Sequence, residues 1–408
     1  MTTATAFNPG LLPSSAPRSA RVVFAVLRHL RLGMLDVQLP DGGQLRFGSP
    51  RIGEPQANIR LLNWKLCSAV LRSGDIGFAE SHIAGDWTTA DLTALLRLML
   101  VNREAIASMV YGSWWGQLLH RARHLLNRNS RAGSRRNIHA HYDLGNEFYS
   151  LWLDGTMNYS SAWFDGDLSQ AMATAQQAKV RRALSQCQVG EGSRVLEIGC
   201  GWGALAECAA GELGARVVGV TLSREQLEFA QNRVTAAGLG ARCELRLQDY
   251  RDIADGPFDA IASIEMFEAV GREYWSGYFA MIARQLKPSG RACIQSITIR
   301  DDLFERYVSG TDFIQQYIFP GGLLPSREVF RAEARKAGLV VVHELAFGPD
   351  YAETLRRWRA AFQRHDTQVR NLGFDTRFMR IWEFYLAYCE AAFDAGSTDV
   401  VQFTLAHA

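Results

Sequence analysis

The chain of 408 residues lacks the patterns that mark several special classes of protein. No uninterrupted apolar run approaches the ~20 residues that are needed to span a bilayer. The seven cysteines are scattered, with no CxxC pair and no Cys/His cluster at zinc spacing, so we expect reduced thiols and no metal site. The N-terminus has no basic start followed by an apolar core, so we expect no secretory signal. These absences favour a soluble, cytoplasmic protein.

Charge and composition exclude further classes. The chain has 44 Lys and Arg against 42 Asp and Glu, and a formal net charge of +2 gives no global field that would attract nucleic acid. Hydrophobic residues make up 48% of the chain and charged residues 21%, which excludes a disordered or fibrous protein. Because single hydrophobic cores stop growing at about 250–300 residues, we expect two domains.

Changes in composition predict four parts. Residues 1–20 are rich in Thr, Ser, Ala and Pro without an amphipathic period, which indicates a disordered tail. Residues 21–115 are predicted to form a small α+β domain, with a hairpin at 37–47 and a short apolar helix near 92–100. An Arg-rich linker, 116–136, and a catalytic domain, 137–408, complete the chain.

The linker is unusually basic. It has six arginines, and no acid follows until Asp143. It has two interpretations, a solvated connection between domains or a segment attracted to anionic lipid headgroups, where each arginine contributes about 1 kcal/mol. Nucleic acid is disfavoured because the segment has no interleaved aromatic residues for base stacking. The arginines are Arg121, Arg123, Arg128, Arg131, Arg135 and Arg136.

Beyond residue 137, apolar strands alternate with helices. Residues 194–198 and 216–220 read as buried strands around a helix at 204–213, which is the length that a right-handed βαβ crossover needs. The pattern predicts a doubly wound α/β domain. The other expected strands are 243–247, 258–263 and 292–297, and the other expected helices are 224–236 and 275–286.

A glycine-rich turn follows the first of these strands. Gly199, Gly201 and Gly203 lie where the chain must turn tightly and let a ligand approach the backbone. Their spacing is GxGxG, which differs from the GxGxxG of nicotinamide-binding proteins. Glu197, inside the strand, is suited to the ammonium group of an amino-acid-like cofactor. Together these residues resemble motif I of class I S-adenosylmethionine-dependent methyltransferases.

Two further strand ends agree with that resemblance. Thr221 and Gln226 follow the second strand, where such enzymes hold the ribose and the methionine end. Gln248 and Asp249 follow the third, where an acid commonly meets the adenine amino group. The resemblance implies S-adenosylmethionine as the cofactor. The alternative is that the acids Glu197 and Asp249 only cap neighbouring helices.

Longer motifs make the resemblance specific. From about residue 137 to the C-terminus, the chain resembles the cyclopropane-fatty-acyl-phospholipid synthase family, which includes the mycolic acid cyclopropane synthases. This implies a Rossmann-like methyltransferase sheet with helical lipid-binding additions. The motifs are HYDLGN at 141–146 with Phe148 and Tyr149, MNYS at 157–160, QQAK at 176–179, QDYR at 248–251, EMFE at 265–268 with Val270 and Gly271, and YIFPGG at 317–322.

The resemblance implies a reaction. A methyl(ene) carbon passes from S-adenosylmethionine to the cis double bond of an unsaturated phospholipid acyl chain, and a cyclopropane forms. Such a site must be dry and apolar and must stabilise positive charge, and aromatic ring faces attract cations. Besides Tyr159 and Ser160 at the cofactor, we therefore expect aromatic residues to bind the acyl chain, although each could equally be ordinary core. These are Tyr142, Phe148, Tyr317 and Phe319.

The expected base site departs from the family pattern. The family holds a bicarbonate ion with a Cys, a Glu, a His, a backbone group and a Tyr, and this ion is thought to act as the base. Here Ser161 replaces the Cys and Gln295 replaces the His. Both can donate hydrogen bonds to an anion, but neither titrates near neutral pH. The remaining expected members of the catalytic set are Glu268, the backbone at Ile297, and Tyr385.

These changes leave the base and the product open. The alternative product is a methyl- or methylene-branched chain, with a separate reductase for the saturated form. A third hypothesis is a non-catalytic lipid- and cofactor-binding protein, against which the intact glycines and Glu268 argue. We expect peripheral contact with anionic phospholipids at the inner face of the membrane. A homodimer is compatible with the sequence.

Overall fold

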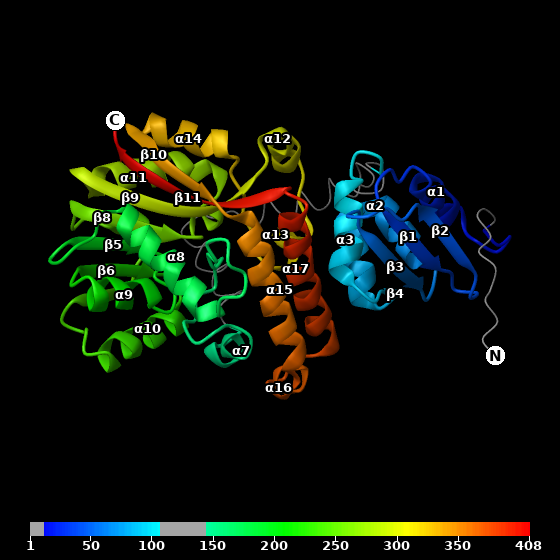
Figure 1. The fold of residues 1–408 in the computed structure, drawn as a ribbon, viewed down its shortest axis with the longest axis horizontal. Helices are drawn as coiled ribbons and strands as arrows, with labels where there is room; N and C mark the ends of the chain where they lie inside the picture. Colours follow the sequence, from blue (N-terminus) through cyan, green and yellow to red (C-terminus); the bar gives the residue numbers. More distant parts are fainter. Residues whose placement is uncertain (1–11, 107–143) are drawn as a thin grey trace. The chain divides into compact units, whose positions relative to one another are not determined.

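The computed structural model describes residues 12–106 and 144–408 (Figure 1). They divide into two compact units. The first contains 12–106 together with Gly310–Ile318 and Gly373–Ser397, and the second contains the rest. The expected division at 116–136 differs from this one, because two segments of the expected catalytic domain belong to the first unit. The linker itself lies outside the described residues.

The first unit contains a four-stranded sheet with the strand order β2-β1-β3-β4. β1 pairs antiparallel with β2, which confirms the predicted hairpin, and pairs parallel with β3. Strand residues alternate between buried and exposed in β2 and β3, as expected for a sheet with one face on the core. The strands are β1 (Met34–Gln38), β2 (Gln44–Gly48), β3 (Gln56–Leu61) and β4 (Trp87–Thr88).

Five helices complete this unit among the described residues: α1 (Arg18–Leu27), α2 (Lys65–Ala84), α3 (Leu92–Val101), α13 (Phe313–Tyr317) and α17 (Thr376–Asp394). The predicted tail ends earlier than expected, because α1 begins at Arg18 and Ala20 is fully buried. Side-chain hydrogen bonds join the distant segments, since Thr93 donates to Glu390 at 3.1 Å and Tyr317 donates to Glu80 at 2.6 Å.

The second unit is built on a seven-stranded sheet with the order β10-β11-β9-β8-β5-β6-β7. β5 to β9 are parallel, and β11 lies antiparallel between β9 and β10. All five predicted strands are present, with small changes at their ends. The strands are β5 (Arg194–Ile198), β6 (Arg216–Thr221), β7 (Cys243–Leu247), β8 (Phe258–Ile264), β9 (Leu286–Ile299), β10 (Leu339–Ala346) and β11 (Thr398–His407).

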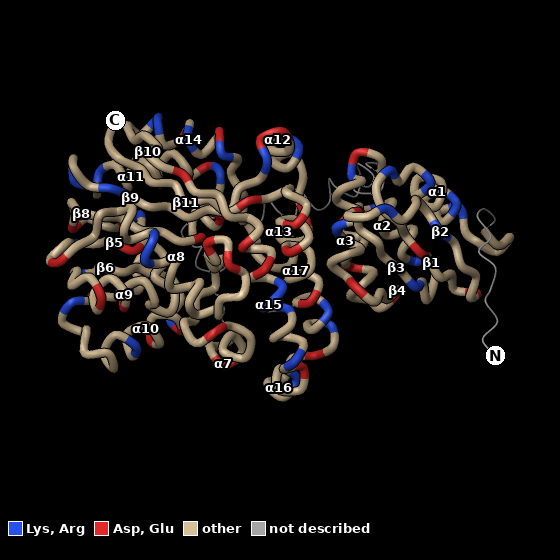
Figure 2. Tube along the Cα trace, viewed as in Figure 1, with Lys and Arg blue, Asp and Glu red and all other residues tan. Residues whose placement is uncertain are grey.

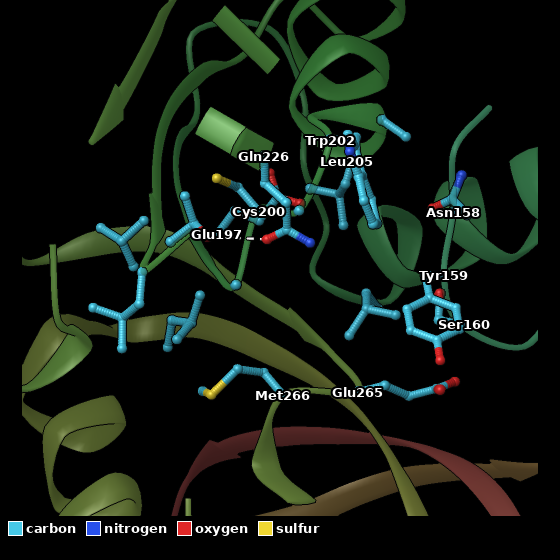
Figure 3. Close-up of a pocket in the computed structure, with 18 of the residues that line it drawn as sticks. Asn158, Tyr159, Ser160, Glu197, Cys200, Trp202, Leu205, Gln226, Glu265 and Met266 are labelled. Atoms are coloured by element: carbon cyan, nitrogen blue, oxygen red, sulfur yellow. Dashed lines mark hydrogen bonds between the residues drawn. The ribbon is translucent and has the colours of Figure 1, made fainter. Parts of the chain in front are cut away.

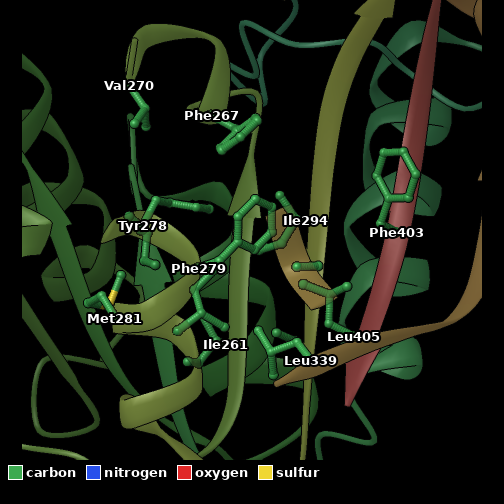
Figure 4. Close-up of a cluster of buried hydrophobic side chains, with 14 of the residues drawn as sticks. Ile261, Phe267, Val270, Tyr278, Phe279, Met281, Ile294, Leu339, Phe403 and Leu405 are labelled. Carbon is green, nitrogen blue, oxygen red and sulfur yellow. The ribbon is translucent and has the colours of Figure 1, made fainter. Parts of the chain in front are cut away.

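Helices cover both faces of this sheet, so the doubly wound α/β prediction is confirmed. One buried cluster packs α8, α9 and α10 on the sheet, and another packs α11 and α14 on it (Figure 4). These helices are α8 (Met172–Gln186), α9 (Ala204–Glu212), α10 (Arg224–Ala236), α11 (Trp275–Gln285) and α14 (Arg327–Lys336). The others are α7 (Asn146–Ser150), α12 (Asp301–Ser309), α15 (Gly348–Arg364), α16 (Asp366–Asn371) and the short 3₁₀ turns η1 (Tyr250–Asp252), η2 (Phe267–Ala269) and η3 (Arg272–Tyr274).

The sheet order places a ligand site. From β5 the order runs to β6 and β7 on one side and to β8 and β9 on the other. In open α/β sheets, ligands bind at the carboxyl ends of the strands where the order reverses, which here is between β5 and β8. Within 12–106 and 144–408, the structure has no helix that is both long enough and apolar enough to cross a membrane.

Candidate active site

A cavity opens at the carboxyl ends of β5, β6, β7 and β8 (Figure 3). It contains eight of the ten residues that the sequence assigns to the cofactor. The two exceptions are Gly203 and Asp249. The eight residues are Tyr159, Ser160, Glu197, Gly199, Gly201, Thr221, Gln226 and Gln248. Lining residues to which the sequence assigned no role include Asn158, Cys200, Trp202, Leu205, Tyr250, Glu265 and Met266.

The glycine turn is shaped by close contacts. Gly199 has a φ of +83°, and a Cβ there would lie 3.0 Å from Cγ of Met266, which lines the cavity. Gly203, also at +83°, precedes α9, and its Cβ would lie 2.9 Å from Cβ of Ala230 on α10. Gly203 therefore lets α9 and α10 pack closely and supports the site without lining it.

Glu197 is the charged residue inside this turn region. Its side chain is only 4% exposed, and its Oε2 has no hydrogen-bond partner among the described residues. Burial raises the pKa of this carboxyl well above its usual range. An unpaired buried carboxylate oxygen is costly, so the site fits a ligand that brings a cation and hydrogen-bond donors.

Asp249 is held away from the cavity by its neighbour. Nε and Nη2 of Arg251 donate to its two carboxylate oxygens at 2.8 and 2.6 Å, and the Arg251 amide donates to it as well. Tyr250, between the two residues, lines the cavity instead. The end of β7 thus contributes Gln248 and Tyr250, while Asp249 fixes the turn that presents them.

Aromatic rings surround Tyr159 at the cavity wall. Its ring centroid lies 5.4 Å from those of Tyr149 and Trp152 and 5.5 Å from that of Trp358. The rings meet at tilted or edge-on angles, which favours packing between aromatic quadrupoles. Of these rings Tyr159 lines the cavity, where its ring is able to stabilise a positive charge, and the others support it from behind. Neither Trp152, which lies between the motifs at 141–149 and 157–160, nor Trp358, which lies beyond them all, was assigned a role from the sequence.

Glu265, directly after β8, is the centre of a buried hydrogen-bond network. The amide of Ser161 and Nε2 of Gln295 donate to its Oε1 at 2.9 and 2.7 Å, and the hydroxyl of Tyr351 donates to its Oε2 at 2.6 Å. Its φ of +50° is rare for a residue with a side chain. Burial raises the pKa of its carboxyl, while Tyr351 and the charge of Lys179 act in the opposite direction. The sequence motif contains Glu265, but no role was predicted for it.

Glu268, predicted either to hold the anion or to act as the base, is not among the residues that line the cavity. The amide of Ile297 donates to its Oε1, and its Oε2 has no hydrogen-bond partner within the described part of the chain. Burial, followed by the nearby charge of Glu265, raises the pKa of Glu268 to about 8. Because Glu265 lines the cavity and Glu268 does not, Glu265 is the better placed base.

With this geometry established, comparison with known proteins identifies the family. The family model described as mycolic acid cyclopropane synthetase matches residues 129–403. The chain belongs to this family. It is 40% identical to the tuberculostearic acid methyltransferase UfaA1 of Mycobacterium tuberculosis, over 97% of this chain and 92% of that protein. It is 34% identical to the cyclopropane-fatty-acyl-phospholipid synthase of Escherichia coli K12, over 88% and 92% of the two chains.

Solved structures agree with the family. The crystal structure of the mycolic acid cyclopropane synthase CmaA1, complexed with SAH and CTAB, covers 66% of this chain and 97% of its own. The identity is 33% and the TM-score is 0.62. Coclaurine N-methyltransferase, at 18% identity and a TM-score of 0.61, shares the fold. The Rossmann-like methyltransferase fold inferred from the glycine turn is confirmed.

Two of the residues that correspond to the family's bicarbonate ligands, Ser161 and Gln295, are engaged elsewhere. Oγ of Ser161 donates to the carbonyl of Ala162 at 2.8 Å. Both polar atoms of the Gln295 side chain are engaged, since its Nε2 donates to Glu265 and its Oε1 accepts from Gln402 at 3.0 Å. These groups do not fit bicarbonate. The structure brings Ser161 and Gln295 together, but on the carboxylate of Glu265.

The predicted acyl-chain residues are dispersed. Phe148 is fully buried among aromatic rings of the second unit, and Phe319 is in that unit too. Tyr317 is in the first unit, where it stacks on Phe313. Tyr142 lies outside the described residues. None of the three described acyl-chain residues lines the cavity at the strand ends. Tyr385, which the sequence assigns to the catalytic set, does not line it either and packs edge-on against Trp382 in the first unit.

Proposed function

We propose that this protein transfers a methyl group from S-adenosylmethionine to the double bond of an unsaturated fatty-acyl chain and releases a methylene-branched chain. The observation that carries this proposal is the carboxylate of Glu265, which receives the donors that would otherwise surround an external anion. The relative UfaA1, whose name describes a tuberculostearic acid methyltransferase, supports a branched product. Cyclopropanation is the second candidate, supported by the name of the Escherichia coli relative.

The cavity residues divide the task of holding the cofactor. Glu197 pairs with its ammonium group, and the turn at Gly199 and Gly201 lets it approach the backbone. The amide and hydroxyl groups of Gln226 and Thr221, which are 3.2 Å apart, face the same cavity and can exchange their mutual hydrogen bond for bonds to a ligand. Bound there, the cofactor supplies an electrophilic methyl group.

The remaining residues manage the charge on the substrate. The π electrons of the alkene form the new bond to the methyl carbon, the bond from sulfur to that carbon breaks, and the neighbouring chain carbon becomes cationic. The ring of Tyr159, which lines the cavity, stabilises this cation. A 1,2-hydride shift from the methyl-bearing carbon to the cationic carbon then moves the positive charge onto the methyl-bearing carbon. Glu265 then accepts a proton from the transferred methyl group, whose C–H electrons form the exocyclic double bond.

Labelled cofactor distinguishes the products. With a fully deuterated methyl donor and oleoyl phospholipid vesicles, we expect acyl chains that retain two deuterons in an exocyclic CD₂ group, seen by mass spectrometry, deuterium NMR and carbon NMR. Two deuterons in an upfield ring signal would show cyclopropanation instead. Three retained deuterons would exclude proton removal by Glu265, and no transfer to any acyl chain would contradict the proposed substrate class.

We also propose that the substrate is reached at a membrane surface that contains anionic phospholipid. The Arg-rich linker supports this, and so does α1, along which basic residues lie (Figure 2). Arg18 and Arg21 are exposed there beside the half-exposed Val22. Such a mixed basic and apolar face is typical of helices that lie on membranes.

Removal of four linker arginines tests this proposal. Replacing Arg121, Arg123, Arg128 and Arg131 with Ala should weaken binding to anionic vesicles at low salt by roughly tenfold or more, since each contributes about 1 kcal/mol near such a surface. Vesicle co-sedimentation measures this. Replacement of the exposed Arg284, Arg335 and Lys336 is the control and should have less effect per charge. Equal loss in both variants would assign the effect to net charge alone.

A further inference from the structure

A buried lysine lies beside the proposed base without a role in the chemistry described above. Lys179, on α8, is fully buried, and its Nζ donates to Oγ of Ser160 at 2.5 Å. One turn earlier on the same face of α8, Nε2 of Gln176 donates to the carbonyl of Ser160 at 2.8 Å. Helix α8 thus holds Ser160, which lines the cavity, by both its side chain and its backbone.

The charge of Lys179 is balanced by two nearby acids, Glu265 and Asp154. Burial lowers the pKa of Lys179 to about 8, while the negative charges of Glu265 and Asp154 favour its protonated form. The attraction is reciprocal, because the positive charge of Lys179 favours the ionised form of Glu265. A cation matters here, since burial disfavours the ionised form of Glu265 and the charge of Lys179 opposes that effect.

We propose that Lys179 is a positioning residue for this reaction: its ammonium group fixes Ser160 at the cavity wall, and its charge keeps Glu265 ionised. This rests on the proposed function, because it takes Glu265 as the base. The titratable groups that act on Glu265 are Lys179 from α8 and Tyr351 from α15. Glu265 in turn acts on Glu268 from η2, and Asp154 acts on Lys179. Among them, Lys179 supplies the positive charge.

Two substitutions separate its charge from its hydrogen bond. K179Q keeps a donor for Ser160 and removes the charge, whereas S160A keeps the charge and removes the hydrogen bond. A base must be ionised to act, so kcat/KM rises with pH through the pKa of Glu265. In K179Q we expect this acid limb to move up by about one pH unit or more, with activity partly recovered at pH 9. In S160A we expect the limb to stay at the wild-type pH.

A second neutral variant and measurements of folding and cofactor affinity separate a loss of charge from a loss of structure. K179M is a second neutral variant in case K179Q does not fold, and thermal unfolding and cofactor affinity are measured for all three. The same loss of activity at every pH in a folded neutral variant would overturn the proposal, as would an equal shift in S160A. Full activity of E265Q would instead refute Glu265 as the base, so the failure of the proposed function is recognised separately.

Discussion

Replacing Glu265 with Gln is expected to lower turnover by roughly 10²–10⁴-fold, which is the usual contribution of a positioned general base. Gln keeps the volume of the side chain and can still accept hydrogen bonds from Ser161 and Gln295, but it cannot take a proton. Cofactor affinity, measured by calorimetry, should change far less than turnover. Glu273→Gln, on the exposed surface of η3, is the matched control and should behave as the wild type.

A second variant at the same position sharpens this test. Glu265 has a φ of +50°, a conformation that suits glycine, so Glu265→Gly relieves backbone strain. It also leaves an anion-sized space surrounded by the amide of Ser161, the amide of Gln295 and the hydroxyl of Tyr351. Added formate or bicarbonate should therefore restore part of the activity to this variant and none to E265Q. Undiminished turnover in both variants without added anion would contradict the role of Glu265.

Eight of the ten residues that the sequence assigns to the cofactor line one cavity, because the signal there is local. A parallel strand followed by a glycine turn fixes the backbone over a few residues, and the ends of adjacent parallel strands meet at one edge of the sheet. Glu197, Thr221 and Gln248 could therefore be assigned from their positions after successive strands. Asp249 was the exception, since only the side-chain geometry shows that Arg251 holds it.

The network around Glu265 depends on contacts between distant parts of the chain. Ser161, Gln295 and Tyr351 come from a loop, from β9 and from α15, and no spacing in the sequence indicates that they meet. The available signal was that Glu265 directly follows β8, the neighbour of β5 in the sheet. Comparison with the family pattern drew attention to Ser161 and Gln295 individually, but not to the carboxylate that they share.

The division into units shows a second limit of sequence analysis. The helices α13 and α17 come from within the range 137–408, yet they belong to the compact unit of the N-terminal sheet. An amphipathic sequence pattern predicts that one face of each helix is buried, but it does not indicate which of the two hydrophobic cores that face joins. The pairing of Thr93 with Glu390, 297 residues apart, is visible only in three dimensions.

Replacing Glu197 with Gln is expected to weaken S-adenosylmethionine binding by roughly 10–100-fold, since a hydrogen bond to a charged group contributes about 1.5–3 kcal/mol.

The direction in which cofactor affinity changes with pH gives a further test of Glu197. Burial raises the pKa of Glu197 in the empty protein, and a bound ammonium group would lower it, so binding releases a proton below the raised pKa. Wild-type affinity should therefore increase as the pH rises toward that value, whereas the affinity of E197Q should be nearly flat. Calorimetry in buffers of different ionisation enthalpy measures both quantities. Glu207→Gln, on α9 beyond the cavity, is the control. Affinity of E197Q within twofold of the wild type at every pH would show that the cofactor's cation lies elsewhere in the cavity.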